Sequence, residues 1–149
     1  MKLNTLEDTF NLSKKIGKLL SHGDVIFLYG EIGVGKTTFA RLLINNYEKE
    51  KNLKVSEVLS PTFNIVFEYD IKKLTIKHYD LYRLRNDSDI KNIGLFEDLE
   101  QTITLIEWPE LIKKKPSNRI DLFFEYSDSM IERSLIIKTS GRLKIHEFQ

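Results

Sequence analysis

The sequence predicts an α/β fold: a three-layer sandwich with a mostly parallel central sheet and one antiparallel hairpin. Apolar runs typical of strands alternate with segments of helical periodicity, and a glycine-rich turn joins the first such run to a helix. Two further extended runs are separated by only four residues, which favours a hairpin. Because the chain has 149 residues and neither a repeat nor a linker, residues 1–149 are predicted to form a single domain.

The first half of the chain is predicted to hold a helix, a strand and a second helix. Thr5 and Asp8 have the spacing of a capping box, and apolar residues then recur at i, i+4 and i+7, which predicts a helix over about 5–20. Residues 24–29 lack polar alternation, as is typical of a strand covered on both faces. Apolar residues spaced four apart predict the second helix over 36–48.

The second half is dominated by predicted strands. Residues 63–69 and 74–79 are extended and are separated by 70–73, so they are expected to pair as the antiparallel hairpin. The mixed segment 86–100 is predicted to form short helices around Gly94. Further strands are expected over 102–106, 120–126 and 134–138.

The amino-acid composition excludes several kinds of site and partner. The 23 basic and 22 acidic side chains nearly balance, so there is no overall drive towards nucleic acid or membrane. The absence of cysteine excludes disulfides, thiolate metal sites and cysteine nucleophiles. Acids stand near the amino terminus where a signal peptide has its apolar core, and no apolar run approaches the ~20 residues of a membrane span. We expect a cytoplasmic protein without membrane contact.

The segment between the first predicted strand and the second helix carries the clearest chemical signal. Residues 30–37, GEIGVGKT, match G-x-x-x-x-G-K-[ST], the phosphate-binding P-loop, in its usual strand-to-helix context. The glycines allow a tight turn whose N–H groups converge on phosphates, and the following helix adds its positive end. Lys36 is expected to reach the outer phosphates and Thr37 to ligate Mg²⁺. The sandwich is therefore predicted to be of the P-loop NTPase type, and the chain to bind a nucleoside triphosphate.

Two acids follow predicted strands and are candidates for a metal site. A P-loop needs an acid at the carboxyl end of a neighbouring strand to hold Mg²⁺ or its water, and Asp80 and Glu107 both meet this condition. Either residue alone also fits a solvated acid at a strand end. In Ser60-Pro61-Thr62, the proline favours an extended backbone that directs the Thr62 hydroxyl at a γ-phosphate or metal, although the same tripeptide is common at the entry to a strand.

Other residues have plainer interpretations. His78 is predicted to be a structural hydrogen-bonding residue, and Trp108-Pro109 is predicted to end a strand. The lysines 113–115 are predicted to form a solvated helix end. There is no N/T-K-x-D segment of the kind that selects guanine, so adenine is favoured. The sequence also lacks an arginine-rich lid of the nucleotide-kinase type, which weighs against phosphorylation of a small molecule.

Four segments together resemble one family, the bacterial tRNA threonylcarbamoyladenosine biosynthesis ATPases called TsaE. The resemblance runs from about Thr9 to Arg133 and rests on GEIGVGKTT at 30–38, SPTF at 60–63, HYDLYRL at 78–84 and IEWPE at 106–110. The P-loop is widespread, whereas the other three segments in this order are specific. The family usually has Leu and Ala where this chain has Ile32 and Val34, but the loop binds through its backbone.

The resemblance implies roles for individual residues. Thr37 and Glu107 would hold Mg²⁺, Asp80 would act near the metal or on the attacking water, and Thr62 would lie in a segment that orders around the γ-phosphate. The residues it implies in catalysis are Lys36, Thr62, Asp80 and Glu107. The residues it implies around the nucleotide are Thr9, Ile32, Gly33, Val34, Gly35, Lys36, Thr37, Thr38, Trp108, Glu110 and Arg133.

The resemblance also implies a function. The family hydrolyses ATP in a complex that attaches threonylcarbamoyl to the adenosine beside the anticodon of tRNA, while a TsaD-type partner paired with a TsaB-type subunit performs the transfer. The expected cofactors are ATP and Mg²⁺, tRNA is met indirectly through the complex, and hydrolysis is slow without the partners. Two alternatives stay open: a small P-loop kinase acting on a metabolite, and a binding module in which ATP only fixes a conformation.

Overall fold

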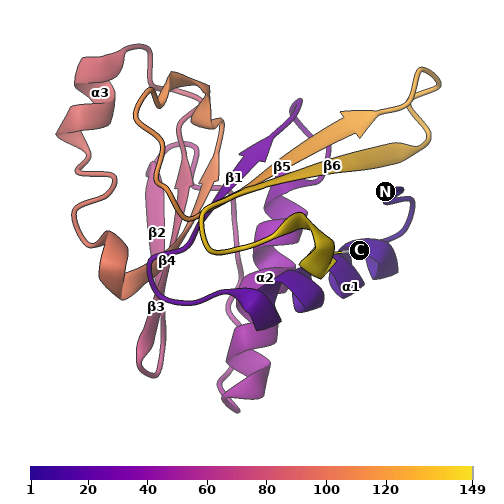
Figure 1. Ribbon diagram of the computed structural model, residues 1–149, viewed down its shortest axis with the longest axis horizontal. Helices are drawn as coiled ribbons and strands as arrows, with labels where there is room; N and C mark the ends of the chain where they lie inside the picture. Colours follow the sequence, from indigo (N-terminus) through magenta and orange to yellow (C-terminus); the bar gives the residue numbers. More distant parts are fainter. Residues whose placement is uncertain (149) are drawn as a thin grey trace.

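A twisted six-stranded sheet runs through the centre of the molecule (Figure 1). The computed structural model describes residues 1–148. The strand order is β2-β3-β4-β1-β5-β6, with parallel pairing in the centre and an antiparallel pair at each edge. The strands are β1 (Val25–Tyr29), β2 (Val66–Ile71), β3 (Leu74–Asp80), β4 (Thr102–Glu107), β5 (Arg119–Tyr126) and β6 (Arg133–Ser140). The predicted α/β class, mostly parallel sheet and antiparallel hairpin are confirmed.

The predicted hairpin is present, but its turn is shorter than expected. Asp70 pairs with Thr75 and Ile71 with Leu74, so Asp70 and Ile71 belong to β2 and only two lysines form the turn. Lys72 has a φ of 58°, in the left-handed region that two-residue hairpin turns require. Glycine and asparagine are the usual residues there, so the lysine pair concealed the turn. A second antiparallel pair, β5 with β6, forms the other edge of the sheet.

Two long helices cover one face of the sheet. In Figure 1, α1 (Leu6–Leu19) and α2 (Lys36–Glu50) lie beside each other. The predicted capping box is present at α1: the Asp8 backbone N–H donates to Thr5 Oγ1 at 3.1 Å, and the Thr5 N–H donates to the Asp8 carboxylate at 2.9 Å. The second helix runs two residues further than predicted.

Shorter elements pack on the opposite face. They are α3 (Asp87–Asn92) and the 3₁₀ helices η1 (Leu99–Gln101) and η2 (Pro109–Leu111), while a further 3₁₀ helix, η3 (Ile145–Phe148), lies near the carboxyl terminus. The predicted short helices in 86–100 are thus confirmed as α3 and η1. Across residues 1–148, no helix combines the length and apolar character needed to cross a membrane.

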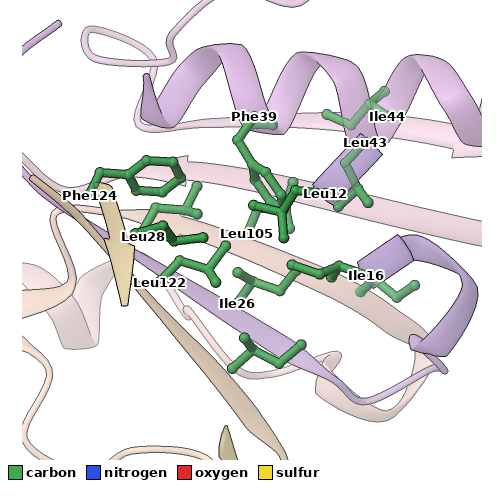
Figure 2. Packing of buried hydrophobic residues seen from close by; sticks show 14 of the residues in the cluster. Leu12, Ile16, Ile26, Leu28, Phe39, Leu43, Ile44, Leu105, Leu122 and Phe124 are labelled. Atoms are coloured by element: carbon green, nitrogen blue, oxygen red, sulfur yellow. The ribbon is translucent and has the colours of Figure 1, made fainter. Parts of the chain in front are cut away.

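Each face of β1 contributes to its own hydrophobic core. Ile26 and Leu28 point to the side covered by α1 and α2, whereas Val25 and Phe27 point to the side covered by the short helices. All four side chains are fully buried, which explains the lack of polar alternation in this strand. The larger core is shown in Figure 2, where residues of α1 and α2 interlock with residues of β1, β4 and β5. This packing fixes the position of α2 against the sheet.

Truncation of Phe39 is expected to destabilise the fold. This side chain of α2 is fully buried between the helix and the sheet, with its ring centroid 6.2 Å from that of Phe124. We expect Phe39→Ala to lower the free energy of unfolding by ~3–5 kcal/mol, measured by equilibrium urea denaturation, because it removes apolar contacts and leaves a cavity. Leu6→Ala is the control, since Leu6 is 60% exposed and should change stability by ~0.5 kcal/mol or less. Equal losses in the two variants would contradict this account of the core.

Candidate functional site

The P-loop forms the connection between β1 and α2. Gly30, Gly33 and Gly35 have φ angles of 143°, 80° and 120°, which residues with a side chain rarely adopt. At Gly30 a Cβ atom would lie 2.7 Å from the Phe124 carbonyl oxygen, so the loop also passes too close to β5 for any side chain there. The helix begins at Lys36 with no side-chain cap from Gly35. Its first N–H groups therefore face the loop and can bind an anion.

A pocket of about 350 Å³ opens above this loop at the carboxyl ends of the parallel strands. Four separate stretches of the chain meet there: the P-loop with the start of α2, the segment before β2, the end of β3, and the end of β4. The lining residues that the sequence predicted are Ile32, Gly33, Gly35, Lys36, Thr37, Thr38, Thr62, Asp80, Glu107 and Trp108. Ser60 and Tyr82 also line the pocket and were not predicted as site residues.

Glu107 and Thr37 meet because their strands run in parallel. Glu107 ends β4 in register with Leu28 of β1, only two residues before the P-loop begins. The Thr37 hydroxyl lies 3.0 Å from each carboxylate oxygen of Glu107, which is 3% exposed. A hydroxyl and a carboxylate are hard oxygen ligands of the kind Mg²⁺ prefers. The pair therefore fits a Mg²⁺ ion.

The number of protein ligands bears on how a metal could be held here. Over residues 1–148 there is no group of three His, Cys, Asp or Glu side chains that could enclose an ion. Mg²⁺ usually takes one or two protein ligands and completes its six positions with phosphate oxygens and water. The arrangement of Thr37 and Glu107 thus suits a metal that arrives with a nucleotide.

Asp80 holds the segment that enters β2. Its Oδ2 accepts hydrogen bonds from Ser60 Oγ at 2.8 Å and from Thr62 Oγ1 at 2.9 Å. Its Oδ1 accepts from the Tyr82 backbone N–H at 2.9 Å. Asp80 pairs with Glu107 in the β3–β4 register, so two carboxylates stand side by side at the edge of the pocket. The predicted Thr62 hydroxyl therefore contacts Asp80 in this structure.

Lys36 is folded back into the site. Its ammonium donates to the Gly30 carbonyl oxygen and lies 3.6 Å from the centroid of the Trp108 ring. Burial lowers the pKa of Lys36, and the nearby charges of Glu107, Glu110 and Asp80 oppose this effect. The Lys36 ammonium is thus held among acidic side chains, within the pocket in which it could contact a phosphate.

Trp108 and Tyr82 form an aromatic wall. Trp108 ends β4 as predicted, and Pro109 opens η2 directly after it. The Trp108 backbone is left-handed, with φ 58° and ψ 56°, and the Trp108 ring lies against Lys36. The Tyr82 and Trp108 ring centroids are 4.9 Å apart with an interplanar angle of 51°.

Four residues predicted near the nucleotide lie outside this lining set among the described residues. Thr9 is buried in α1, and the Val34 side chain belongs to the core below the loop. Arg133 donates to the Val34 carbonyl oxygen at 3.4 Å, and Glu110 acts on Lys36 through its charge. Contact of these four side chains with a nucleotide stays a prediction.

A further tyrosine supports the loop from outside the pocket. The Tyr126 hydroxyl donates to the Gly33 carbonyl oxygen at 2.7 Å and so fixes the orientation of this peptide group. The contact joins residues 93 positions apart. Nothing in the spacing of the sequence indicated it, whereas Ser60 and Tyr82 at least fall within the segments SPTF and HYDLYRL.

Comparison with known proteins gives the family. The family model described as "Threonylcarbamoyl adenosine biosynthesis protein TsaE" matches residues 3–135. The chain belongs to the TsaE family. The resemblance drawn from the four sequence segments is confirmed.

Individual TsaE proteins are similar over most of the chain. The tRNA threonylcarbamoyladenosine biosynthesis protein TsaE of Rickettsia felis is 40% identical over 111 residues, which cover 74% of this chain and 63% of the relative. The Bacillus subtilis protein of the same name is 33% identical over 119 residues, covering 78% of this chain and 70% of that one. The crystal structure of Bacillus subtilis YdiB superposes with a TM-score of 0.73 at 26% identity, covering 95% of this chain and 84% of YdiB.

Proposed function

We propose that this TsaE protein is a Mg²⁺-dependent ATPase required for threonylcarbamoyl modification of the adenosine next to the anticodon of tRNA. The observation that carries the proposal is the convergence of the P-loop, the Thr37–Glu107 pair and the Thr62–Asp80 pair in one pocket. Membership of the TsaE family supports the assignment to threonylcarbamoyladenosine biosynthesis. A tRNA substrate would place the reaction in the cytoplasm.

In the proposed ATP hydrolysis, different residues of the pocket would bind the phosphates and the metal. The N–H groups of the P-loop and of the first turn of α2 would hold the phosphates, and Lys36 would leave the Gly30 carbonyl oxygen to reach the outer ones. Thr37 and Glu107 would hold Mg²⁺, which neutralises charge on the phosphates when bound. Thr62 would donate to the γ-phosphate.

Asp80 is the group best placed to act on water. Once Thr62 turns to the γ-phosphate, the Asp80 carboxylate loses one of its donors and can accept a proton from water. The water oxygen would bond to the γ-phosphorus, the bond from that phosphorus to the bridging oxygen would break, and ADP and phosphate would leave. The water proton would pass through Asp80 or directly to solvent.

The charge of the pocket supports dependence on partners. Among the described residues that line it, Lys36 is the one cation. P-loop enzymes commonly use a second cation to stabilise the charge that develops on the phosphates, and this cation often comes from another protein. We propose that TsaD-type and TsaB-type partners complete the site and that tRNA is met through them. The near-neutral charge of the chain is compatible with this indirect contact.

ATP turnover by the purified chain, alone and with TsaB-type and TsaD-type partners plus tRNA, tests the proposal. We expect slow turnover alone and a rise of ~10³-fold or more with the partners, as for other sites completed by a second protein. Lys36→Ala should remove the stimulated rate. Unchanged turnover would instead favour a kinase if a metabolite accepts the phosphate, or a nucleotide-gated binding module if none does.

A further inference from the structure

His78 is a buried titratable side chain that the proposed mechanism does not use. It lies on β3, in register with Leu105 of β4 and Phe67 of β2, and is 0% exposed. Its Nε2 is 2.7 Å from Glu107 Oε2. In the part of the chain that the structure describes, His78 Nδ1 is buried without a hydrogen-bond partner. A buried polar atom without a partner is unfavourable, so a core position without function would be better served by an apolar residue.

The direction of the His78–Glu107 hydrogen bond follows from chemistry. An ionised carboxylate only accepts hydrogen bonds, so the proton of this bond lies on Nε2 and the ring donates. In the neutral form of the ring, Nδ1 then carries a lone pair rather than an unpaired N–H. The tautomer is thus set by Glu107, and the ring is held in place by the strands on both sides.

The two donors to Glu107 differ in what they fix. The Thr37 hydroxyl is equidistant from both carboxylate oxygens, at 3.0 Å, and it carries a single proton. It therefore does not define which oxygen is left free. His78 contacts Oε2 and leaves Oε1 without a bond to the ring. The orientation of the carboxylate thus depends on His78.

We propose that His78 is a positioning residue for the metal site: its Nε2–H holds Oε2 of Glu107, so that Oε1 is presented to Mg²⁺ or its bound water. This inference rests on the proposed function, because it presupposes that Glu107 binds the metal of a nucleotide complex. Hydrogen bonds from outer residues orient metal ligands, and losing one commonly reduces metal affinity 10–100-fold. His78 itself touches neither nucleotide nor metal.

Two amide substitutions of His78 test whether the position of the N–H donor matters, independently of the imidazole ring. In His78→Gln the amide nitrogen can reach the position of Nε2, whereas in His78→Asn it stops near the position of Nδ1, too far from Glu107. Both variants place one amide in the same buried position, so they should destabilise the fold to a similar degree. Thr104→Val is the matched control. Thr104 is buried like His78 but lies on the neighbouring strand β4, and its hydroxyl contacts Thr102 at 3.2 Å, away from the pocket.

The measurement is the binding of a non-hydrolysable ATP analogue to the full chain by calorimetry, in Mg²⁺ and in EDTA. The ratio of the two dissociation constants gives the Mg²⁺-linked gain in affinity. We expect His78→Gln to keep most of the wild-type gain and His78→Asn to reduce it ~10-fold or more. Affinity in EDTA should stay at the wild-type level in all variants, and urea denaturation without ligand reports any general loss of stability.

The outcomes distinguish this inference from the proposed function. No Mg²⁺-linked gain in the wild-type chain would overturn the proposed function and this role with it. A wild-type gain that His78→Asn retains would overturn the role of His78 alone, as would an equal loss in Thr104→Val. If His78→Asn does not fold, His78→Leu removes the donor without burying a new polar group, and the same comparison decides.

Discussion

Lys36→Ala is expected to reduce partner-stimulated ATP turnover by at least ~10²–10³-fold, equivalent to ~2.7–4 kcal/mol of barrier. Lys36 is 4% exposed and is the cation that stands among Glu107, Asp80 and Glu110. Without it, the phosphates of ATP would enter a pocket whose remaining charged groups repel them. Affinity for ATP should therefore fall together with the rate, and calorimetry on the purified chain would measure this loss.

Lys49→Ala is the control for the Lys36 variant. Lys49 lies on the same helix, α2, is exposed, and carries the same charge away from the pocket. We expect its turnover and ATP affinity to stay near the wild-type values, because long-range effects of an exposed charge are screened by salt. Similar losses in both variants would point to net charge or helix stability and would contradict a local role for Lys36.

Glu107→Gln is expected to remove most of the Mg²⁺-dependent turnover while leaving the fold intact. Glutamine keeps the shape of the side chain and one acceptor oxygen for Thr37 and His78, but it removes the negative charge and replaces the second carboxylate oxygen with an NH₂ group that cannot bind a metal. Loss of a metal ligand of this kind should slow partner-stimulated turnover by ~10²–10³-fold. A Mg²⁺ titration of ATP turnover, with the partners present, measures the effect.

The matched change for Glu107→Gln is Glu100→Gln. Glu100 is exposed near the start of β4, at the end of that strand remote from the P-loop. Its substitution should leave both the rate and the Mg²⁺ requirement unchanged. Wild-type turnover in Glu107→Gln with all partners present would show that the metal is bound elsewhere.

The part of the site predicted from sequence is the part set by local or strand-end geometry. The P-loop is contiguous, so its glycines and Lys36 define it directly. Asp80 and Glu107 could be predicted to converge because carboxyl ends of parallel strands share one edge of a sheet. The long helices α1 and α2 likewise followed from the spacing of their apolar residues, and β1 followed from its lack of polar alternation.

The remaining contacts depend on tertiary packing that no spacing encodes. Tyr126 reaches Gly33 only because β5 lies beside β1. Ser60 acquires a role through Asp80, and His78 through Glu107, each across a neighbouring segment. The left-handed turns at Lys72 and Trp108 lack the glycine or asparagine that would have signalled them.

The polar groups that would receive ATP already have partners within the chain. Lys36 donates to Gly30, Thr37 to Glu107, and Ser60 and Thr62 to Asp80. If a nucleotide binds as proposed, its entry would be an exchange of hydrogen bonds, because each of the Thr37, Ser60 and Thr62 hydroxyls has a single proton to donate. Exchange of this kind lowers the net affinity, because the free energy of the broken bonds is subtracted. If the chain hydrolyses ATP as proposed, departing ADP and phosphate would leave groups that return to their internal partners, which would favour rapid release of the products.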